Sequence, residues 1–203
     1  LKKADPFWRM EKKAKVLIVC TELCTLHFQK EHTPDNMTSS MLFSDGAAAV
    51  LVSGNDDDEG LQLQHFYSAV LSKGKKDMAW ELSRNGFLMT LSSHIPELIG
   101  EDFNSLVTDA LASASLGKEN IHHWCIHPGG RKILESVHKS LDFVNGQLQC
   151  SYDILKEYGN MSSPTILFVL ERMIRENKLR SSDKIFGAAF GPGINMETFI
   201  LTA

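Results

Sequence analysis

The chain has 203 residues, of which 25 are acidic and 21 are Lys or Arg, so its formal net charge is -4. Hydrophobic residues make up 43% and charged residues 23% of the chain, as in ordinary globular proteins. The mild acidity argues against general electrostatic binding to nucleic acid, and no apolar run is long enough to span a bilayer. We therefore expect a globular protein with no nucleic-acid partner and no membrane span.

The four cysteines, Cys20, Cys24, Cys125 and Cys150, fit neither a zinc ribbon nor a CxxC redox motif. Cys20 and Cys125 lie in apolar, strand-like runs, where a reduced cysteine behaves as a small hydrophobic residue. This usage predicts reduced thiols and a cytoplasmic location.

The first part of the chain predicts a helix, two strands and a linker. Residues 1–15 form a mixed charged stretch of helical character, and the apolar run at 16–20 is typical of a strand buried on both faces. After a polar stretch with a proline, we expect a short helix, an Asp-Gly turn and a second buried strand at 47–51. The acidic, glycine-flanked segment 54–60 predicts a solvated linker.

Strands and helices alternate beyond the linker, which predicts α/β layers and allows two related halves. Ser162 is a candidate cap for the last helix, with Pro164 in its first turn. We expect strands within 61–72, 85–92, 121–126, 184–190 and 194–203, helices at 94–114, 132–141, 151–158 and 165–177, and a polar connection at 73–84.

Three motifs at the ends of predicted elements could carry chemistry. His127 in C-I-H-P-G-G follows a predicted buried strand, where α/β folds bind ligands; the alternative is a hydrogen-bonded turn histidine. Asn160 in Y-G-N-M-S-S is either a turn former or an amide donor able to stabilise an oxyanion. The sequence F-G-P-G at 190–193 predicts a tight hairpin or a backbone wall around a ligand.

A metal site is the other possibility on the strand at 121–126. His123, Cys125 and His127 would share one face of a strand, and zinc accepts such ligands. No carboxylate or fourth ligand is close in the sequence, so we predict no metal.

Five segments of the chain together resemble one known family. They are VLIVCTEL, SMLFSDGAAAVLV, WCIHPGGRKILESV, EYGNMSSPTILFVLERM and FGPGINMETFIL, and they occur in collinear order along essentially the whole chain. They are similar to the type III polyketide synthases, the chalcone and stilbene synthase family. The combination of HPGG, GNMSS and GPG is specific for that family.

The resemblance implies a thiolase-like α/β fold, with two similar halves, mixed sheets and layers in the order α-β-α-β-α. Residues 1–53 would then end the N-terminal half, 54–60 would be the linker, and 61–203 would form the C-terminal half. The chain begins with Leu1 rather than methionine, and we expect a truncated or processed product whose upstream residues carry part of the function. A homodimer is also implied.

The resemblance further implies an acyltransferase that joins malonyl-CoA to an acyl-CoA starter by decarboxylative Claisen condensation, with these CoA thioesters as substrates and no cofactor. His127 and Asn160 match the catalytic histidine and asparagine of the family, and the nucleophilic cysteine is expected just before Leu1, so this chain alone should be inactive. The expected substrate-binding residues are Cys24, His27, Phe43, Met89, Ser162, Phe190, Gly191, Pro192 and Gly193, with Phe43 and Met89 as gatekeepers.

Several positions depart from the family pattern. Cys24 and His27 stand where plant chalcone-forming enzymes carry threonines, and Ala189 replaces the first glycine of G-F-G-P-G. These departures argue against chalcone formation and favour a bacterial-type enzyme. Two alternatives stay open: a non-catalytic thiolase-fold binding subunit, and a ketoacyl-synthase-like condensing enzyme that uses a carrier protein.

Overall fold

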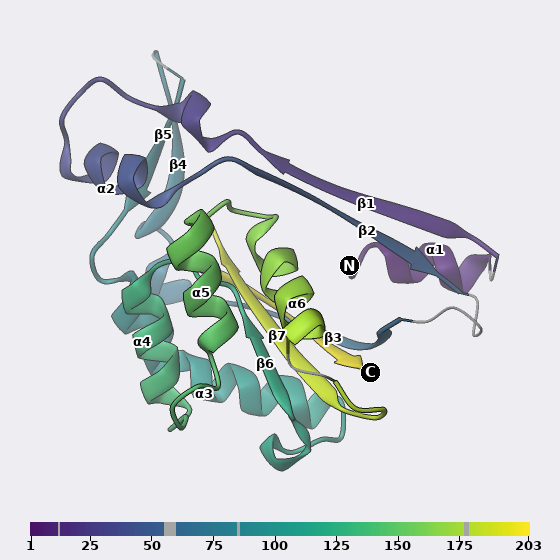
Figure 1. Cartoon of the computed structure of the whole chain (residues 1–203). Coiled ribbons are helices and arrows are strands. Elements are labelled where there is room, and N and C mark those ends of the chain that lie inside the picture. The colour runs from purple at the N-terminus through teal and green to yellow at the C-terminus, as the bar shows by residue number, and fades with distance from the viewer. Residues whose placement is uncertain (12, 55–59, 85, 177–178) are drawn as a thin grey trace.

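The computed structural model describes residues 1–11, 13–54, 60–84, 86–176 and 179–203 (Figure 1). Most of the predicted linker at 54–60 lies outside these residues. Within the described ranges, no helix combines the length and the apolar character that a bilayer crossing requires.

A mixed four-stranded sheet forms the centre of the molecule. Its strand order is β3-β8-β7-β6, where β6 and β7 run parallel and the other neighbours are antiparallel. The strands are β3 (Gln62–Val70), β6 (His123–Ile126), β7 (Lys184–Gly191) and β8 (Asn195–Thr202). Strands β3, β6 and β8 fall within segments that the sequence predicted as strands, and β7 extends one residue beyond its predicted segment, to Gly191.

Helices cover both faces of this sheet, with α5 and α6 in front of it in Figure 1. Successive residues of β6 point to opposite faces, so Trp124 and Ile126 pack into the core with α3 and α4, whereas Cys125 packs with α5 and α6. The helices are α3 (Ile95–Ser113), α4 (Arg131–Ser140), α5 (Gln149–Tyr158) and α6 (Thr165–Glu176).

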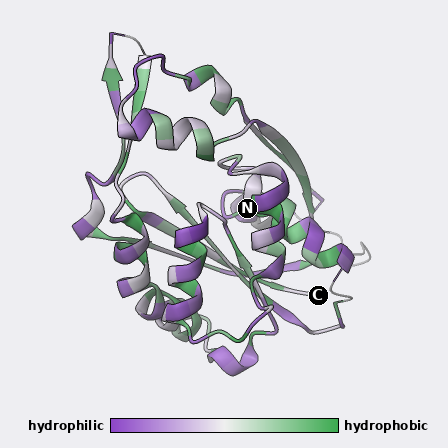
Figure 2. Ribbon diagram, turned by 60° about the vertical axis from the view of Figure 1, so that its left-hand side comes forward, coloured by the Kyte–Doolittle hydropathy of each residue, from purple (hydrophilic) through white to green (hydrophobic). Residues whose placement is uncertain are grey.

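The antiparallel ribbon of β1 (Lys15–Glu22) and β2 (Gly46–Ser53) forms a further layer, because β2 packs against α6. The order is therefore helices, sheet, helices and ribbon, which agrees with the expected layering. The ribbon is hydrophobic along much of its length (Figure 2).

The expectation that both ribbon strands are buried on both faces is wrong for the chain as described. Residues alternate between exposed and half-buried along β1, and Leu17 and Val19 are 63% and 62% exposed. The reason is that one face of the ribbon packs toward α6 while Leu17, Val19 and Leu51 point away from it.

A hairpin of β4 (Met78–Ser83) and β5 (Gly86–Leu91) corrects a second expectation, because β4 lies where the sequence predicted a polar connection. Pairing from Met78 opposite Leu91 to Ser83 opposite Gly86 stabilises this strand despite its polar flanks. The remaining elements are α1 (Ala4–Met10), α2 (Pro34–Leu42) and the short 3-10 helices η1 (Cys24–His27), η2 (Ser72–Gly74) and η3 (Lys118–Asn120).

Two helix starts also differ from expectation. The helix α2 begins earlier than predicted, because the Thr33 hydroxyl accepts a hydrogen bond from the Asn36 amide at 3.2 Å and Pro34 suits the first turn. At the start of α6, the amide of Thr165 donates to the main-chain carbonyl of Ser162 at 3.2 Å rather than to its hydroxyl. Ser162 itself has a positive φ of 60°.

We predict that Gly187→Ala destabilises the fold. Gly187 pairs with Phe199 across β7 and β8, and a methyl group at Gly187 would lie 2.0 Å from the Phe199 ring. Overpacking of this kind costs about 1–3 kcal/mol. Urea unfolding should show this loss for Gly187→Ala but not for Gly191→Ala, where an added methyl meets nothing within 4 Å. Equal stabilities of the two variants would contradict the prediction.

Candidate active site

His127 directly follows β6 and is held by its main chain. Its amide donates to the carbonyl of Ala188 on β7 at 2.8 Å, and its carbonyl accepts from the amide of Gly129 at 3.0 Å. The histidine is 6% exposed, so its imidazole lies inside the molecule and not on a surface turn. The glycines after it allow the chain to turn into α4.

Asn160 follows Gly159, which ends α5 with a φ of 73°. The Asn160 amide donates to the carbonyl of Leu42 at 3.0 Å, and its carbonyl accepts from the amide of Ser44 at 2.9 Å. The main chain of Asn160 is thus hydrogen-bonded on both sides to the segment between α2 and β2. That segment lies more than a hundred residues earlier in the chain. A side chain at Gly159 would meet Ser44, so this close approach needs glycine.

The side chain of Asn160 shows both of the roles that the sequence left open. Its Oδ1 accepts a hydrogen bond from the amide of Ser162 at 2.9 Å, which is the turn-forming role. Its Nδ2 donates to the carbonyl of Gly129 at 3.3 Å, and Gly129 belongs to the HPGG segment. The two motifs that were predicted separately therefore meet in space.

His127 and Asn160 line one cavity of about 1190 Å³ between the ribbon end, the β4–β5 hairpin and the central sheet. Eight of the nine predicted substrate-binding residues line it as well, namely Cys24, His27, Phe43, Met89, Ser162, Phe190, Gly191 and Pro192. Gly193 does not line this cavity; its amide donates to the carbonyl of Met78 at 2.6 Å. The turn at 190–193 is thus the predicted hairpin between β7 and β8, and residues 190–192 also form part of the cavity wall.

Phe43 is positioned through Asn160. The two residues form an isolated parallel β-bridge, in which the hydrogen bonds run from Asn160 to Leu42 and from Ser44 to Asn160. Met89 reaches the same cavity from β5, in register with Trp80 on β4. The expected pair of gatekeepers therefore comes from two separate elements.

Sequence reasoning missed an aromatic group in the cavity wall. The Trp80 ring lies 5.2 Å from the His27 ring and 6.4 Å from the Phe87 ring, measured between centroids. All three side chains line the cavity. A tryptophan inside a segment assigned as a polar connection was the available signal, because tryptophan is uncommon in solvated loops.

Burial shifts the pKa of His127. Removal of the imidazole from solvent lowers its pKa from 6.5 to about 4, because a buried charge is unfavourable. The side chain is therefore neutral at pH 7 in the chain as described, with one ring nitrogen as a donor and the other as an acceptor.

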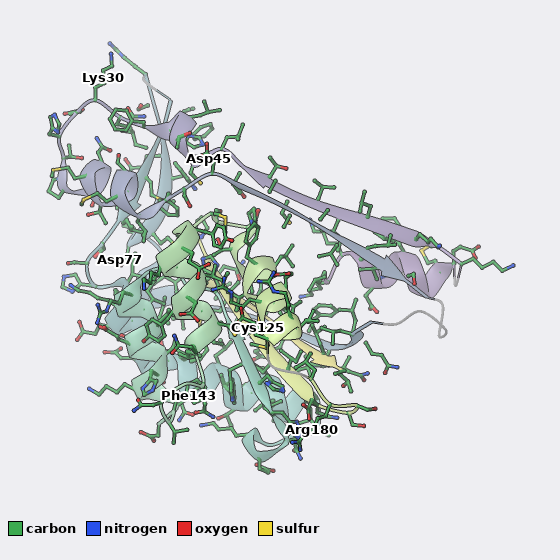
Figure 3. The ribbon with its side chains drawn as sticks, in the orientation of Figure 1. Lys30, Asp45, Asp77, Cys125, Phe143 and Arg180 are labelled. Carbon is green, nitrogen blue, oxygen red and sulfur yellow. The ribbon has the colours of Figure 1, made fainter. Side chains whose placement is uncertain are left out.

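Cys24 also lies at the cavity, but its surroundings disfavour the thiolate. Burial and the nearby carboxylates of Glu22 and Asp45 raise the pKa of the Cys24 thiol. Asp45, labelled in Figure 3, accepts hydrogen bonds from the Thr25 amide at 2.8 Å and from its hydroxyl at 2.7 Å. This carboxylate thereby fixes η1, which carries Cys24 and His27.

The histidines and the cysteine of the possible metal site have other partners. The His123 ring Nε2 lies 3.0 Å from an Asp183 carboxylate oxygen. Cys125 is fully buried beneath α5 and α6 (Figure 3), and its thiol donates to the carbonyl of Ile166 at 3.7 Å. Across the described part of the chain, no group of three His, Cys, Asp or Glu residues is arranged to hold a metal ion.

The sequence profile of the family described as "Chalcone and stilbene synthases, C-terminal domain" matches residues 62–203. A second profile, that of 3-oxoacyl-[acyl-carrier-protein] synthase III, matches residues 1–70. The first match covers well over half of the chain, so the chain belongs to the chalcone and stilbene synthase family.

Three solved structures share the fold. PKS-I from the brown alga Ectocarpus siliculosus superposes with a TM-score of 0.91 at 26% identity, over 99% of this chain and 56% of that protein. The C-terminal type III polyketide synthase domain of Steely1 from Dictyostelium gives 0.90 at 28%, over 98% and 57%. The 1,3,6,8-tetrahydroxynaphthalene synthase of Streptomyces coelicolor A3(2), a bacterial type III polyketide synthase, gives 0.92 at 25%, over 99% and 57%.

These similarities confirm the family and the thiolase-like fold that the sequence suggested. The chain spans little more than half the length of the three solved structures. The division at 53 and 61 and the roles of the individual site residues stay predictions.

We predict that His127 makes stability fall at acid pH. The unfolded chain binds a proton at this residue below about pH 6.5, whereas the folded chain stays neutral there until about pH 4. Lowering the pH from 7 to 5 therefore favours unfolding, by on the order of 2 kcal/mol for this one group.

The measurement is urea unfolding at pH 7 and at pH 5. Between pH 7 and pH 5, His127→Gln should lose less free energy of unfolding than the unchanged chain. The control His32→Gln, which replaces an exposed histidine, should lose as much as the unchanged chain. An unchanged pH dependence in His127→Gln would refute the assignment.

Proposed function

We propose that this chain is part of an acyltransferase that extends an acyl-CoA starter with malonyl-CoA by decarboxylative Claisen condensation. The observation that carries the proposal is that His127 and Asn160 line the same large cavity, where the Asn160 amide donates to the carbonyl of Gly129, two residues after His127. Membership in the chalcone and stilbene synthase family supports it. Because the chain spans about 57% of its solved relatives, the complete reaction is proposed for a protein of their length.

The proposed chemistry needs hydrogen-bond donors at one oxygen. A cysteine thiolate first attacks the acyl-CoA thioester, which forms the acyl–cysteine bond, breaks the acyl–CoA bond and releases CoA as its thiolate. Cleavage of the malonyl carbon–carboxylate bond then releases carbon dioxide and leaves its electron pair as an enolate on the thioester oxygen. The enolate carbon attacks the acyl thioester, which forms the new carbon–carbon bond and frees the cysteine thiolate.

His127 and Asn160 are suited to bind this enolate oxygen. A neutral imidazole donates one N–H, and the Asn160 amide has two N–H groups, of which one is directed to Gly129. A donor of this kind contributes about 3 kcal/mol of transition-state stabilisation. A thiolate beside His127 would attract a proton to the imidazole and oppose the lowering of its pKa by burial.

We place the nucleophile outside this chain, in the segment before Leu1. Of the four cysteines, Cys125 and Cys150 are buried in the core, Cys20 does not line the cavity, and Cys24 lines it with a raised pKa. A raised pKa leaves little thiolate at neutral pH, so Cys24 is a poor nucleophile.

The cavity wall suggests how substrates are held. Phe43 and Met89 would separate the CoA entrance from the acyl cavity, and Trp80 and His27 would narrow the acyl side. CoA thioesters are the only small molecules that this chemistry requires, so no cofactor is proposed. The expected homodimer and cytoplasmic location stay predictions.

A carrier-protein substrate is the second candidate. The match of residues 1–70 to 3-oxoacyl-[acyl-carrier-protein] synthase III favours it, because enzymes of that description act on carrier-bound acyl groups. Comparing malonyl-CoA with a malonyl carrier protein as extender distinguishes the two candidates.

We predict different effects for the two proposed catalytic residues in a protein extended to the length of its relatives. Asn160→Ala should leave acyl loading nearly intact, because an amide does not activate a thiol, and should slow malonyl decarboxylation about a hundredfold. His127→Ala should impair both steps, and the double variant should lose less than the product of the single effects.

Loading is measured as the burst with a labelled starter, and decarboxylation as carbon dioxide release. Ser163→Ala is a control, since Ser163 also lines the cavity but its hydroxyl binds Glu22 at 2.6 Å. Normal decarboxylation with failed loading in Asn160→Ala would show that its role is wrong.

We also predict that the 203-residue chain does not condense malonyl-CoA by itself, because the proposed nucleophile is not in it. Incubation with acyl-CoA and malonyl-CoA should release no CoA above a blank. If CoA is released and Cys24→Ser abolishes the release, then Cys24 is the nucleophile and our assignment fails.

A further inference from the structure

The peptide group between Ile126 and His127 is held on both sides. Its N–H, which belongs to His127, donates to the carbonyl of Ala188 on β7 at 2.8 Å. Its C=O, which belongs to Ile126, accepts a hydrogen bond from the Ser151 hydroxyl on α5 at 2.6 Å. The orientation of this group sets the direction in which His127 leaves the strand.

The strand ladder cannot supply the second of these bonds. In a trans peptide the C=O and the N–H point in opposite directions, so a group whose N–H faces β7 directs its C=O away from β7. Strand β6 is the outermost in the order β3-β8-β7-β6 of the described sheet. The Ile126 carbonyl therefore faces an edge without a neighbouring strand, and α5 covers it.

Solvent cannot readily replace the hydroxyl either. Ser151 and Ile126 are both 0% exposed, and buried carbonyl groups are nearly always hydrogen-bonded. The Ser151–Ile126 contact also joins residues 25 positions apart, from two different elements. It is therefore a tertiary restraint and not a local helix bond.

The same helix leads to Asn160. Helix α5 runs from Gln149 to Tyr158, and Gly159 and Asn160 follow it directly. Near its far end, Glu157 accepts two hydrogen bonds from Arg172 of α6, at 2.9 and 2.6 Å. Ser151 thus ties the first turn of α5 to the His127 strand, while the last turn is fixed to α6 beside Asn160.

We propose that Ser151 is a positioning residue, whose hydroxyl orients His127 and sets its place relative to Asn160 through α5. The inference rests on the proposed function for its kinetic consequence, but the orientation of the His127 peptide can be tested separately. Small displacements of a catalytic group are costly, since a shift of about 1 Å can reduce a rate on the order of a hundredfold.

A matched pair of substitutions tests the proposal. Ser151→Ala removes the hydroxyl bound to Ile126, and Thr198→Val removes a buried hydroxyl that donates to the Tyr67 carbonyl at 3.1 Å. Both remove one hydroxyl-to-carbonyl bond whose donor residue is buried, so both should lower the melting temperature by a similar few degrees. Only the first removes a restraint on the His127 peptide.

The first measurement is hydrogen exchange of the His127 amide, which does not depend on activity. Exchange should be at least about tenfold faster in Ser151→Ala, and within about twofold of the unchanged protein in Thr198→Val. Should Ser151→Ala fail to fold, Ser151→Cys keeps the shape of the side chain with a weaker donor and is measured in its place. Equal exchange at His127 in both variants would overturn the proposal.

The second measurement is malonyl-CoA decarboxylation in the protein extended to the length of its relatives. Ser151→Ala should lower kcat about tenfold with KM within about twofold, and Ser151→Thr, which restores a hydroxyl, should recover most of the rate. If Thr198→Val lowers kcat as much as Ser151→Ala does, the effect is a general loss of structure and the proposal is overturned. If the unchanged extended protein does not decarboxylate malonyl-CoA, the proposed function fails, and hydrogen exchange alone decides the role of Ser151.

Discussion

The candidate site depends on a set of hydrogen bonds that joins three loops distant in the sequence. The backbone of Asn160 pairs with Leu42 and Ser44, and its side chain reaches the Gly129 carbonyl. Asn160 is buried, so its main-chain groups would be unfavourable by about 1–3 kcal/mol each if they lacked these partners. Satisfying these groups brings the His127 turn and the Asn160 turn to one cavity, with Phe43 at its edge.

The layered fold makes this meeting possible and also determines its electrostatics. The helices α3 and α4 cover one face of the sheet and α5 and α6 cover the other, so the end of β6 is shielded from solvent. That shielding lowers the pKa of His127. A neutral donor at the end of a buried strand can bind an oxyanion at neutral pH, and a nearby thiolate can convert it to the cation.

Local sequence patterns predicted helices and strands correctly where the residues within one segment determine its structure. Apolar periodicity located α3 and α4, Gly159 located the end of α5, and apolar, strand-like runs located β6 and β8. They failed for β4, whose stability comes from pairing with β5, and for the ribbon, whose exposed face depends on what packs beside it. The family motifs identified His127 and Asn160, but Trp80 and Ser151 lie in segments that carried no motif.

The sequence by itself determined the class of the fold, the order of its main elements and the residue types suited to condensation chemistry. Those properties depend on short stretches of neighbouring residues, so the spacing and composition of those residues are enough to predict them. Only the tertiary structure decided that Asn160 donates to Gly129, that the Trp80 ring packs against the His27 ring and that Ser151 binds the peptide before His127. Such contacts join residues far apart in the chain, and they arise from the packing of buried polar groups that no local pattern records.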